Sequence, residues 1–280
     1  MIPFRGTTDV SLNRGGAEVI STAMAQTLLP DAQPILNKRV INISPATSMA
    51  GGINVLVEGE TNPRPYGHVI STVPLSCLRM VDVDSCNLSY ALKTAIRTLH
   101  YDASVKVGIK FTDRWWEPLH KGGSSSTDRP TRVVVYPSYG IGGSDATMLC
   151  SYAWSQDAMR LGALVHGPDS PSEKILVELV IQDLAVMHGI PYKTLKEKVV
   201  DYHAFNWYGN EFSCGESFAT FLFPRLFCTL GNSSLNRGCL TGAFALFGPG
   251  QFSNVYQEVT QPAAGGLLHF AGEATSVHHA

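Results

Sequence analysis

A carboxylate follows a short apolar strand near the end of this 280-residue chain. The segment GLLHFAGEATSVHHA contains a glycine turn, a predicted strand over residues 267–270, and then Gly272 leading into Glu273. A strand that enters a Gly-Glu turn normally continues into a helix. The sequence stops seven residues after Glu273, so this carboxylate is a candidate ligand-binding group with no helix behind it.

A lysine lies in a second strand pattern. The segment ASVKVGIKF places Val105, Val107, Ile109 and Phe111 on one face of a strand, because side chains alternate between the faces. Lys106 therefore points to the other face. An ordinary strand lysine is exposed to solvent, and the alternative is an ammonium group that faces a polar cavity.

Composition excludes several classes of protein. The net charge is -2 and charged residues make up 16% of the chain, so there is no basic surface for nucleic acid. No apolar run reaches the about 18 residues of a membrane span. The sequence therefore predicts a protein with a small-molecule partner, and it leaves the compartment and the formation of a homo-oligomer open.

Metal and disulfide sites are not indicated either. The six cysteines are far apart and form no CxxC pair, so neither a zinc site nor a disulfide framework is expected. His278 and His279 are adjacent, which points their side chains apart on a helix or a strand. We therefore expect no metal ion.

The elements that hold these residues follow from periodicity. Helical stripes cover residues 17–29, 88–99 and 170–189, and in the last of these Ser170 and Glu173 form a capping box, Pro171 is the first residue, and Gly189 follows the end. Alternating patterns predict strands in PILNKRVINI, GINVLVEG, HVISTVPLS, RVVVYP and TMLCSYAW. The middle of the chain is therefore an antiparallel sheet with helices.

A complete dinucleotide-binding domain is not present in the sequence. Such a domain shows a strand, then GxGxxG opening a helix, then an acidic residue about 20 positions later. The glycine-rich segments GGINVLVEG and GIGGSDA do not lie between a strand and a helix. They are read as ordinary turns.

Resemblance adds what spacing does not supply. The ending LHFAGEATSVHHA resembles the flavin motif of the FAD-dependent amine oxidases, and LHYDASVKVGIKFTDRWWE followed by GGSSSTDRPTRVVVYPSYG resembles the L-amino-acid oxidases among them, especially fungal ones. RGGAEVISTAM, KRVINI and HVISTVPLS match the same family in the same order. These segments cover most of the chain.

The resemblance implies roles for individual residues. Glu273, with Gly272 before it, binds the ribityl and phosphate region of FAD, and Lys106 holds a water beside flavin N5. Tyr136 binds the substrate carboxylate, and the alternative without the resemblance is an ordinary half-buried strand tyrosine. Trp207 matches a tryptophan packed near the isoalloxazine ring. Val40 matches a strand position whose backbone meets the adenine, and Ala280 matches a residue whose carbonyl receives the substrate amine.

The chemistry that the resemblance implies is oxidation of an L-amino acid by FAD and O2 to a 2-oxo acid, ammonia and H2O2. The flavin is expected to be non-covalent, because Gly242 stands where the monoamine oxidases carry the cysteine that attaches it. Two alternatives remain open. One is an inactive remnant or interaction module, and the other is an oxidase of polyamines or monoamines.

The sequence also departs from the family. The first half of the family, with GxGxxG, is missing, and residues 216–241 have no counterpart, so we interpret the chain as a C-terminal fragment with a translated intron. The predicted fold class is α+β, with an antiparallel substrate-binding domain over residues 80–205. Residues 1–79 and 206–280 are then pieces of a Rossmann-like FAD-binding domain whose N-terminal half is absent.

Overall fold

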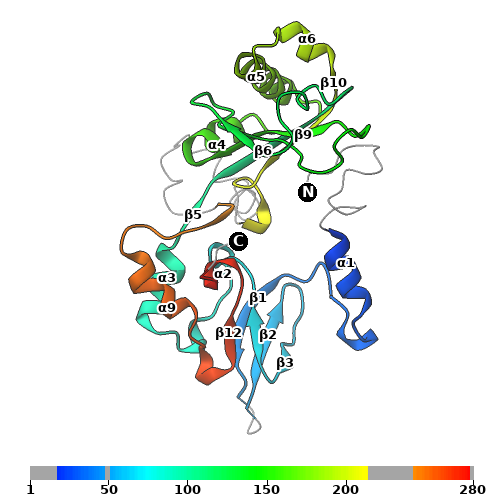
Figure 1. Cartoon of the computed structure of the whole chain (residues 1–280). Helices are drawn as coiled ribbons and strands as arrows, with labels where there is room; N and C mark the ends of the chain where they lie inside the picture. The colour runs from blue at the N-terminus through cyan, green and yellow to red at the C-terminus, as the bar shows by residue number, and fades with distance from the viewer. Residues whose placement is uncertain (1–17, 48–50, 214–241, 278–280) are drawn as a thin grey trace. The chain divides into compact units, whose positions relative to one another are not determined.

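The computed structural model describes residues 18–47, 51–213 and 242–277. They form two compact units, each built from two separate stretches of chain. Of the described residues, the first unit contains 18–34 and 103–207, and the second unit contains 35–47, 51–102, 208–213 and 242–277. Figure 1 shows the helices and strands of both units.

The boundaries between the units differ from the positions 79/80 and 205/206 that the sequence suggested. In the structure the chain passes between units at 34/35, 102/103 and 207/208, so the predicted piece 1–79 is itself divided between the two units. The reason is packing, because helix α3 (Tyr90–Thr98) buries Leu92 and Ile96 in the core of the second unit. Strand β5 (His100–Asp102) then pairs with β11 (Phe244–Leu246) in the same unit.

A five-stranded antiparallel sheet forms the centre of the first unit. Its spatial order is β10-β6-β9-β8-β7, so the long strand β6 lies between β10 and β9. The strands are β6 (Ser104–Phe111), β7 (Ser124–Ser126), β8 (Val133–Val135), β9 (Thr147–Trp154) and β10 (Val199–Asn206). The antiparallel sheet predicted for the middle of the chain is confirmed.

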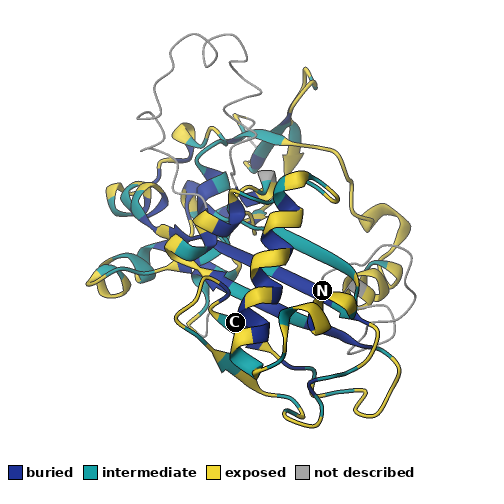
Figure 2. Cartoon of the chain, turned by 90° about the horizontal axis from the view of Figure 1, so that it is seen from above, coloured by how far each residue is buried: buried dark blue, intermediate teal, exposed yellow. Residues whose placement is uncertain are grey.

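The helices of the first unit include the one that the sequence marks most clearly. They are α1 (Glu18–Gln26), α4 (Ser155–Gly162), α5 (Pro171–His188) and α6 (Tyr192–Glu197). Buried and exposed residues alternate along α5 in Figure 2, as expected for a helix with one face on a core. The stripe of α1 is different, because Ile20 and Met24 are 58% and 65% exposed.

Both ends of α5 follow from local chemistry. The Ser170 hydroxyl accepts a hydrogen bond from the Glu173 N–H at 3.2 Å, and Gly189 ends the helix with a left-handed φ of 62°. The capping box is completed differently from the sequence expectation, since the Glu173 carboxylate accepts from the Gly167 N–H at 3.0 Å. The carboxylate thereby fixes the loop before the helix.

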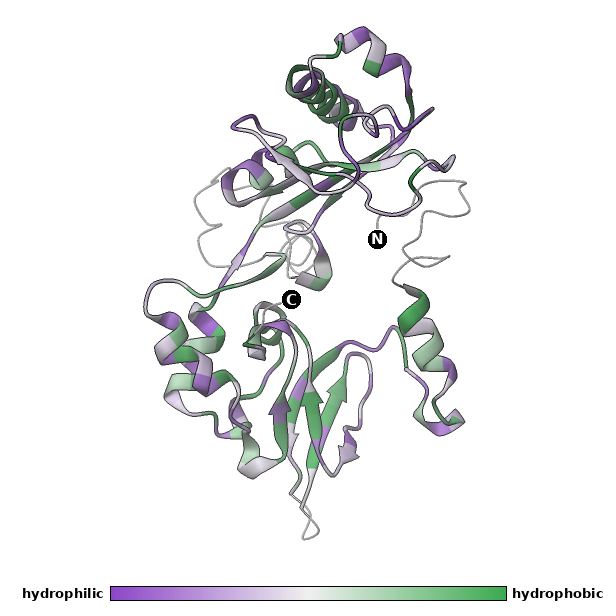
Figure 3. Ribbon diagram, viewed as in Figure 1, coloured by the Kyte–Doolittle hydropathy of each residue, from purple (hydrophilic) through white to green (hydrophobic). Residues whose placement is uncertain are grey.

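The second unit contains three small sheets. Strands β1 (Val40–Pro45), β2 (Ile53–Val57) and β3 (Arg64–Tyr66) form an antiparallel meander, which confirms the hairpin predicted from their alternation. Strands β4 (Val69–Ser71) and β12 (Leu268–Phe270) pair in parallel, and β5 pairs with β11. Figure 3 shows β1 and β2 to be predominantly hydrophobic.

The core of the second unit joins these sheets to α2 (Leu75–Leu78), α3 and α9 (Gln251–Val259). Buried residues from distant segments, among them Ile53, Leu78, Leu99 and Leu268, belong to one hydrophobic cluster. Burial of this apolar surface holds together residues that are up to about 200 positions apart in the sequence.

Among the described residues, no helix has both the length and the apolar character needed to cross a bilayer. The same residues contain no group of three or more His, Cys, Asp or Glu side chains placed to hold a metal ion.

Candidate functional site

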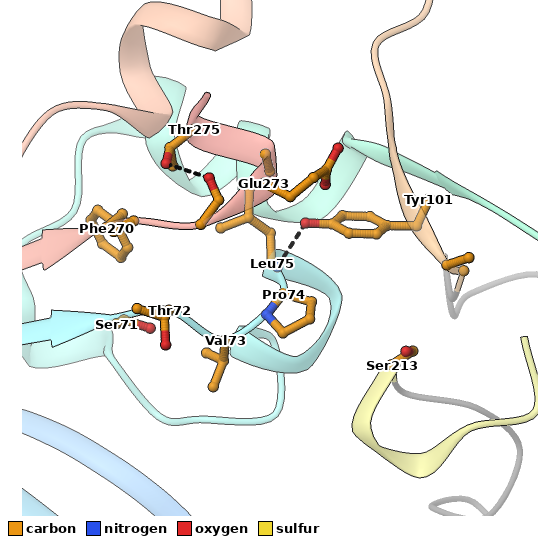
Figure 4. Close-up of a pocket in the computed structure, with 15 residues that line it drawn as sticks. Ser71, Thr72, Val73, Pro74, Leu75, Tyr101, Ser213, Phe270, Glu273 and Thr275 are labelled. Carbon is orange, nitrogen blue, oxygen red and sulfur yellow. Dashed lines mark hydrogen bonds between the residues drawn. The ribbon is translucent and has the colours of Figure 1, made fainter. Parts of the chain in front are cut away.

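The parallel pair β4 and β12 creates the site in the second unit. Leu268 pairs with Val69 and Phe270 with Ser71, so both strands end at the same edge. Open sheets bind ligands beyond the carboxyl ends of parallel strands. The chain leaving β4 and the chain leaving β12 line a cavity of about 150 Å³ at this edge (Figure 4).

Gly272 and Glu273 form the turn that leaves β12. Gly272 has a φ of 123°, a conformation that a residue with a side chain rarely adopts, which explains the glycine at this position. Glu273 begins the short 3-10 turn Glu273–Thr275, and its carboxylate lines the cavity. The carboxylate also accepts a hydrogen bond from the Ala245 N–H at 3.0 Å, so it ties β11 to the cavity wall.

Tyr101 supplies another wall of the cavity. Its side chain is 4% exposed, and its phenol oxygen accepts a hydrogen bond from the Leu75 N–H at 3.0 Å, as Figure 4 shows. Burial raises the pKa of Tyr101 to about 12, and the nearby Glu273 carboxylate acts in the same direction. The phenol is therefore neutral at physiological pH, and it fixes the loop that leads from β4 into α2.

Gly242 lies where the chain enters β11. A Cβ atom on this glycine would stand 2.3 Å from the backbone carbonyl of Tyr101 and 2.5 Å from the Asp102 carbonyl oxygen. No side chain fits at those distances. A cysteine at position 242 would therefore require the backbone to move.

The chemistry of this edge fits part of an FAD site. A carboxylate is an acceptor for the hydroxyl groups of a ribityl chain, and residues 72–74 and 271–273 line the cavity together with Glu273. Val40, expected near the adenine, begins β1 in the same unit and packs partly buried against the core cluster. Val40 does not line the cavity.

Lys106 lies in the first unit, on β6. Its cross-strand partners are Tyr152 on β9 and Phe205 on β10. Val105, Val107, Ile109 and Phe111 are at most 2% exposed, whereas Lys106 is only partly buried. The two-faced strand expected from the sequence is confirmed.

Trp207 follows β10 and shares the face of Lys106. Its ring packs edge-on against Phe205, with 4.7 Å between centroids, and its backbone N–H donates to the Ser104 carbonyl at 2.9 Å. Because Phe205 is the direct partner of Lys106, the sheet brings Lys106 and Trp207 together. The functional roles of both residues stay predictions.

Tyr136 has a different environment from the one expected of a substrate-binding residue. Its side chain is 2% exposed, and its hydroxyl lies 2.9 Å from Ser125 Oγ and 2.6 Å from His188 Nε2. Trp115 contacts both His188 and Phe111, which puts this cluster on the face of the sheet opposite Lys106. The carboxylate-binding role stays a prediction, but this geometry argues against it.

His188 at the end of α5 completes the cluster around Tyr136. Its Nδ1–H donates to the Leu184 carbonyl at 2.8 Å, because a carbonyl can only accept. Burial, together with the nearby His120, lowers the pKa of His188 below its ordinary value. The His120 ring stacks on Tyr136 with 4.2 Å between centroids, so the cluster is a packed part of the first unit.

Ala280 and residues 216–241 lie outside the described residues. The expected carbonyl contact to a substrate amine and the interpretation of the 216–241 segment as a translated intron therefore stay predictions.

The sequence analysis missed two aromatic residues that the structure places at these sites. Tyr101 follows the predicted helix over 88–99 and lines the cavity beside Glu273. Tyr152 lies in the predicted strand TMLCSYAW, where alternation puts it on the less buried face. The alternation of residues could have shown on which face Tyr152 lies, but only the pairing of the strands shows that Lys106 is its neighbour.

Comparisons with known proteins agree with the fold. A profile of the family described as flavin containing amine oxidoreductase matches residues 3–280. A Dictyostelium discoideum protein named as a bifunctional amine oxidase is 40% identical over 95% of this chain and 23% of its own length. L-amino-acid oxidase 4 of Hebeloma cylindrosporum is 38% identical over 85% of this chain and 34% of its own length.

Solved structures extend the comparison to three dimensions. Cyclohexylamine oxidase from Brevibacterium oxydans superposes with a TM-score of 0.66 at 15% identity, over 94% of this chain and 48% of that one. Putrescine oxidase with bound putrescine gives 0.65 at 18% identity, over 95% and 49%. At these identities the likeness shows the fold, and it confirms the predicted α+β class. The chain spans less than half the length of each of these proteins.

Proposed function

The chain belongs to the family of flavin-containing amine oxidoreductases, and from this premise we propose that it contributes to FAD-dependent oxidation of an L-amino acid. The observation that carries the proposal is Glu273 at the shared carboxyl edge of β4 and β12, lining a cavity with Tyr101. FAD is the cofactor to be held there. The substrate class is supported by the name of the Hebeloma cylindrosporum relative.

Bound FAD would supply the oxidising chemistry, removal of a hydride from the substrate Cα with O2 as the final electron acceptor. The amino acid thereby becomes an imino acid, O2 becomes H2O2, and water converts the imino acid to a 2-oxo acid and ammonia. The task of the chain is to bind and orient the two reactants.

Glu273 holds a ribityl hydroxyl as a charged acceptor in this proposal, and Gly272 allows the backbone turn that aims the carboxylate. Tyr101 keeps the cavity wall in place through its bond to the Leu75 N–H. Each contact contributes to orientation, which is the part of flavin catalysis that a protein controls.

Lys106 and Trp207 are proposed to keep the roles that the family resemblance implies, Lys106 as the holder of a water beside flavin N5 and Trp207 as a ring near the isoalloxazine. Lys106 carries an ammonium group whose direct cross-strand partners are the rings of Tyr152 and Phe205, so it can hold a water molecule and supply positive charge during reoxidation. Trp207 offers an indole ring that limits the volume open to the substrate.

An oxidase of amines is the alternative substrate class. It is favoured by the amine oxidase name of the Dictyostelium discoideum relative and by the amine oxidases among the solved structures. The two classes differ in the carboxylate of the substrate, so an L-amino acid and its decarboxylated amine form the most direct pair of test compounds.

We further propose that residues 1–280 alone bind FAD weakly and show no oxidase activity. The sequence contains no GxGxxG turn to hold the pyrophosphate, and one carboxylate does not retain a cofactor of this size. An inactive remnant would behave in the same way, so activity has to be measured on the full reading frame that encodes this chain.

The test is a substrate panel on the protein from the full reading frame and, in parallel, on residues 1–280. H2O2 and 2-oxo acid are measured for L-amino acids, D-amino acids and the corresponding amines. Equal amounts of H2O2 and 2-oxo acid from L-amino acids support the proposal. Turnover of amines alone would assign the protein to the amine oxidases, and a flavin-free, inactive product of the full reading frame would favour the remnant.

A further inference from the structure

Strand pairing in the first unit gives Lys106 a specific neighbour. β6 and β9 are antiparallel, and Lys106 lies directly opposite Tyr152. Directly paired side chains lie on the same face, with their Cβ atoms about 5 Å apart. Tyr152 is therefore the nearest ring to the lysine on that strand.

The contact itself is a cation over an aromatic face. The Lys106 Nζ atom lies 4.8 Å from the centroid of the Tyr152 ring, within the about 6 Å over which a ring attracts a cation. Both side chains are partly buried, so solvent screens the attraction less than at an exposed site. The ring stabilises both the charge and the direction of the ammonium group.

Two further rings pack against the two cross-strand partners of Lys106, Tyr152 and Phe205. Trp154 packs edge-on against Tyr152 with 5.2 Å between centroids, and Trp207 packs edge-on against Phe205 with 4.7 Å. Lys106 thus projects from between two strands that each carry an aromatic pair. A long lysine side chain has considerable rotamer freedom, and this arrangement restricts it.

We propose that Tyr152 is a positioning residue for Lys106, and that it acts through the face of its ring and not through its hydroxyl. The proposal rests on the proposed function in one respect, the role of Lys106 during flavin reoxidation. The contact between Tyr152 and Lys106 exists independently of that role.

Two substitutions separate the ring from the hydroxyl. Tyr152→Phe removes the hydroxyl and keeps the aromatic face, whereas Tyr152→Leu removes the aromatic face and keeps an apolar side chain. Tyr192→Leu is the matched control, because Lys196 lies 5.5 Å from the Tyr192 ring on α6, in a pair unrelated to Lys106.

The first measurement is NMR of the lysine side chains in protein with labelled lysine, and it requires neither flavin nor activity. The resonance that Lys106→Met removes identifies Lys106. We expect its Cε protons to be shifted upfield by the ring, to stay so in Tyr152→Phe and Tyr192→Leu, and to lose the shift in Tyr152→Leu. A resonance that Tyr152→Leu leaves unchanged would overturn the contact.

The second measurement is flavin reoxidation by O2 in the protein from the full reading frame. If the ring positions Lys106, Tyr152→Leu slows reoxidation by about 3- to 10-fold, as expected for loss of one cation–ring interaction, and Tyr152→Phe restores the rate. If Lys106→Met slows reoxidation while Tyr152→Leu does not, the positioning role is wrong. If Lys106→Met itself has no effect on either half-reaction, the proposed role of Lys106 is wrong, and the NMR result alone decides the contact.

Discussion

Replacing Glu273 with glutamine isolates the charge of the carboxylate from its structural bond. In the structure the carboxylate accepts a hydrogen bond from the Ala245 N–H at 3.0 Å. The amide oxygen of Glu273→Gln can accept the same bond, so β11 keeps its anchor. The substitution removes the negative charge that the carboxylate offers to a cofactor hydroxyl.

The expected magnitude follows from hydrogen-bond energies. A bond to a charged acceptor contributes about 1.5–3 kcal/mol and a neutral one about 0.5–1.5 kcal/mol. The difference of about 1–1.5 kcal/mol corresponds to FAD binding that is about 5- to 12-fold weaker. Glu273→Ala should lose more affinity and also stability, because it leaves the N–H of buried Ala245 without its acceptor, at a cost of about 1–3 kcal/mol.

The assay combines FAD titration by fluorescence with thermal unfolding of the flavin-free protein from the full reading frame. Glu273→Gln should weaken FAD binding with an unfolding temperature close to that of wild type, and Glu273→Ala should lower both. If Glu273→Gln binds FAD as tightly as wild type, the carboxylate does not serve the cofactor. If Glu273→Gln unfolds at as low a temperature as Glu273→Ala, the role of the carboxylate is structural.

Three further predictions concern other parts of the chain. Tyr136→Phe removes the hydroxyl that contacts both Ser125 and His188, so it should destabilise the protein by about 1–3 kcal/mol and leave KM unchanged. Denaturant unfolding measures the stability, and steady-state kinetics measure KM. A raised KM at wild-type stability would support the substrate-binding role. Burial lowers the pKa of His188, so its contribution to stability is complete above about pH 6.5 and is lost as the pH falls from there through the folded-state pKa. His188→Gln should therefore flatten the dependence of unfolding free energy on pH below about pH 6.5, and an unchanged slope would contradict the assignment. Gly242→Ala should impair folding because its Cβ meets the Tyr101 carbonyl, and a variant with wild-type unfolding temperature and FAD affinity would show that the entry to β11 is less constrained.

Local sequence determined the elements that depend on local chemistry. Ser170, Pro171 and Gly189 mark the ends of α5 because their effects act within one turn. Alternation of Val105, Val107 and Ile109 gives the buried face of β6 for the same reason. Such signals need no knowledge of the rest of the fold.

Non-local contacts were beyond the reach of the sequence. Tyr101 and Glu273 meet at one cavity only because β5 pairs with β11 and β4 pairs with β12, across separations of more than 140 residues. Tyr152 meets Lys106 through a register that a bulge between Val107 and Gly108 helps to set. None of these strand pairings can be predicted from a local sequence pattern.

Tyr136 shows what a motif leaves open about the surroundings of a residue. The YPSYG segment identified a tyrosine, but burial decides what its hydroxyl can reach. In the structure, Ser125 and His188 are its partners. A motif gives the identity of a residue, and its surroundings give its chemistry.

The central claim is tested most directly by mixing the FAD-loaded protein from the full reading frame with an L-amino acid in the absence of O2. The account predicts that the visible absorbance of the flavin disappears with the L-amino acid and not with the corresponding amine. It also predicts that admission of O2 restores the absorbance with release of one H2O2 for each 2-oxo acid formed. An oxidised flavin that persists with every L-amino acid, or that is reduced only by amines, would contradict the claim.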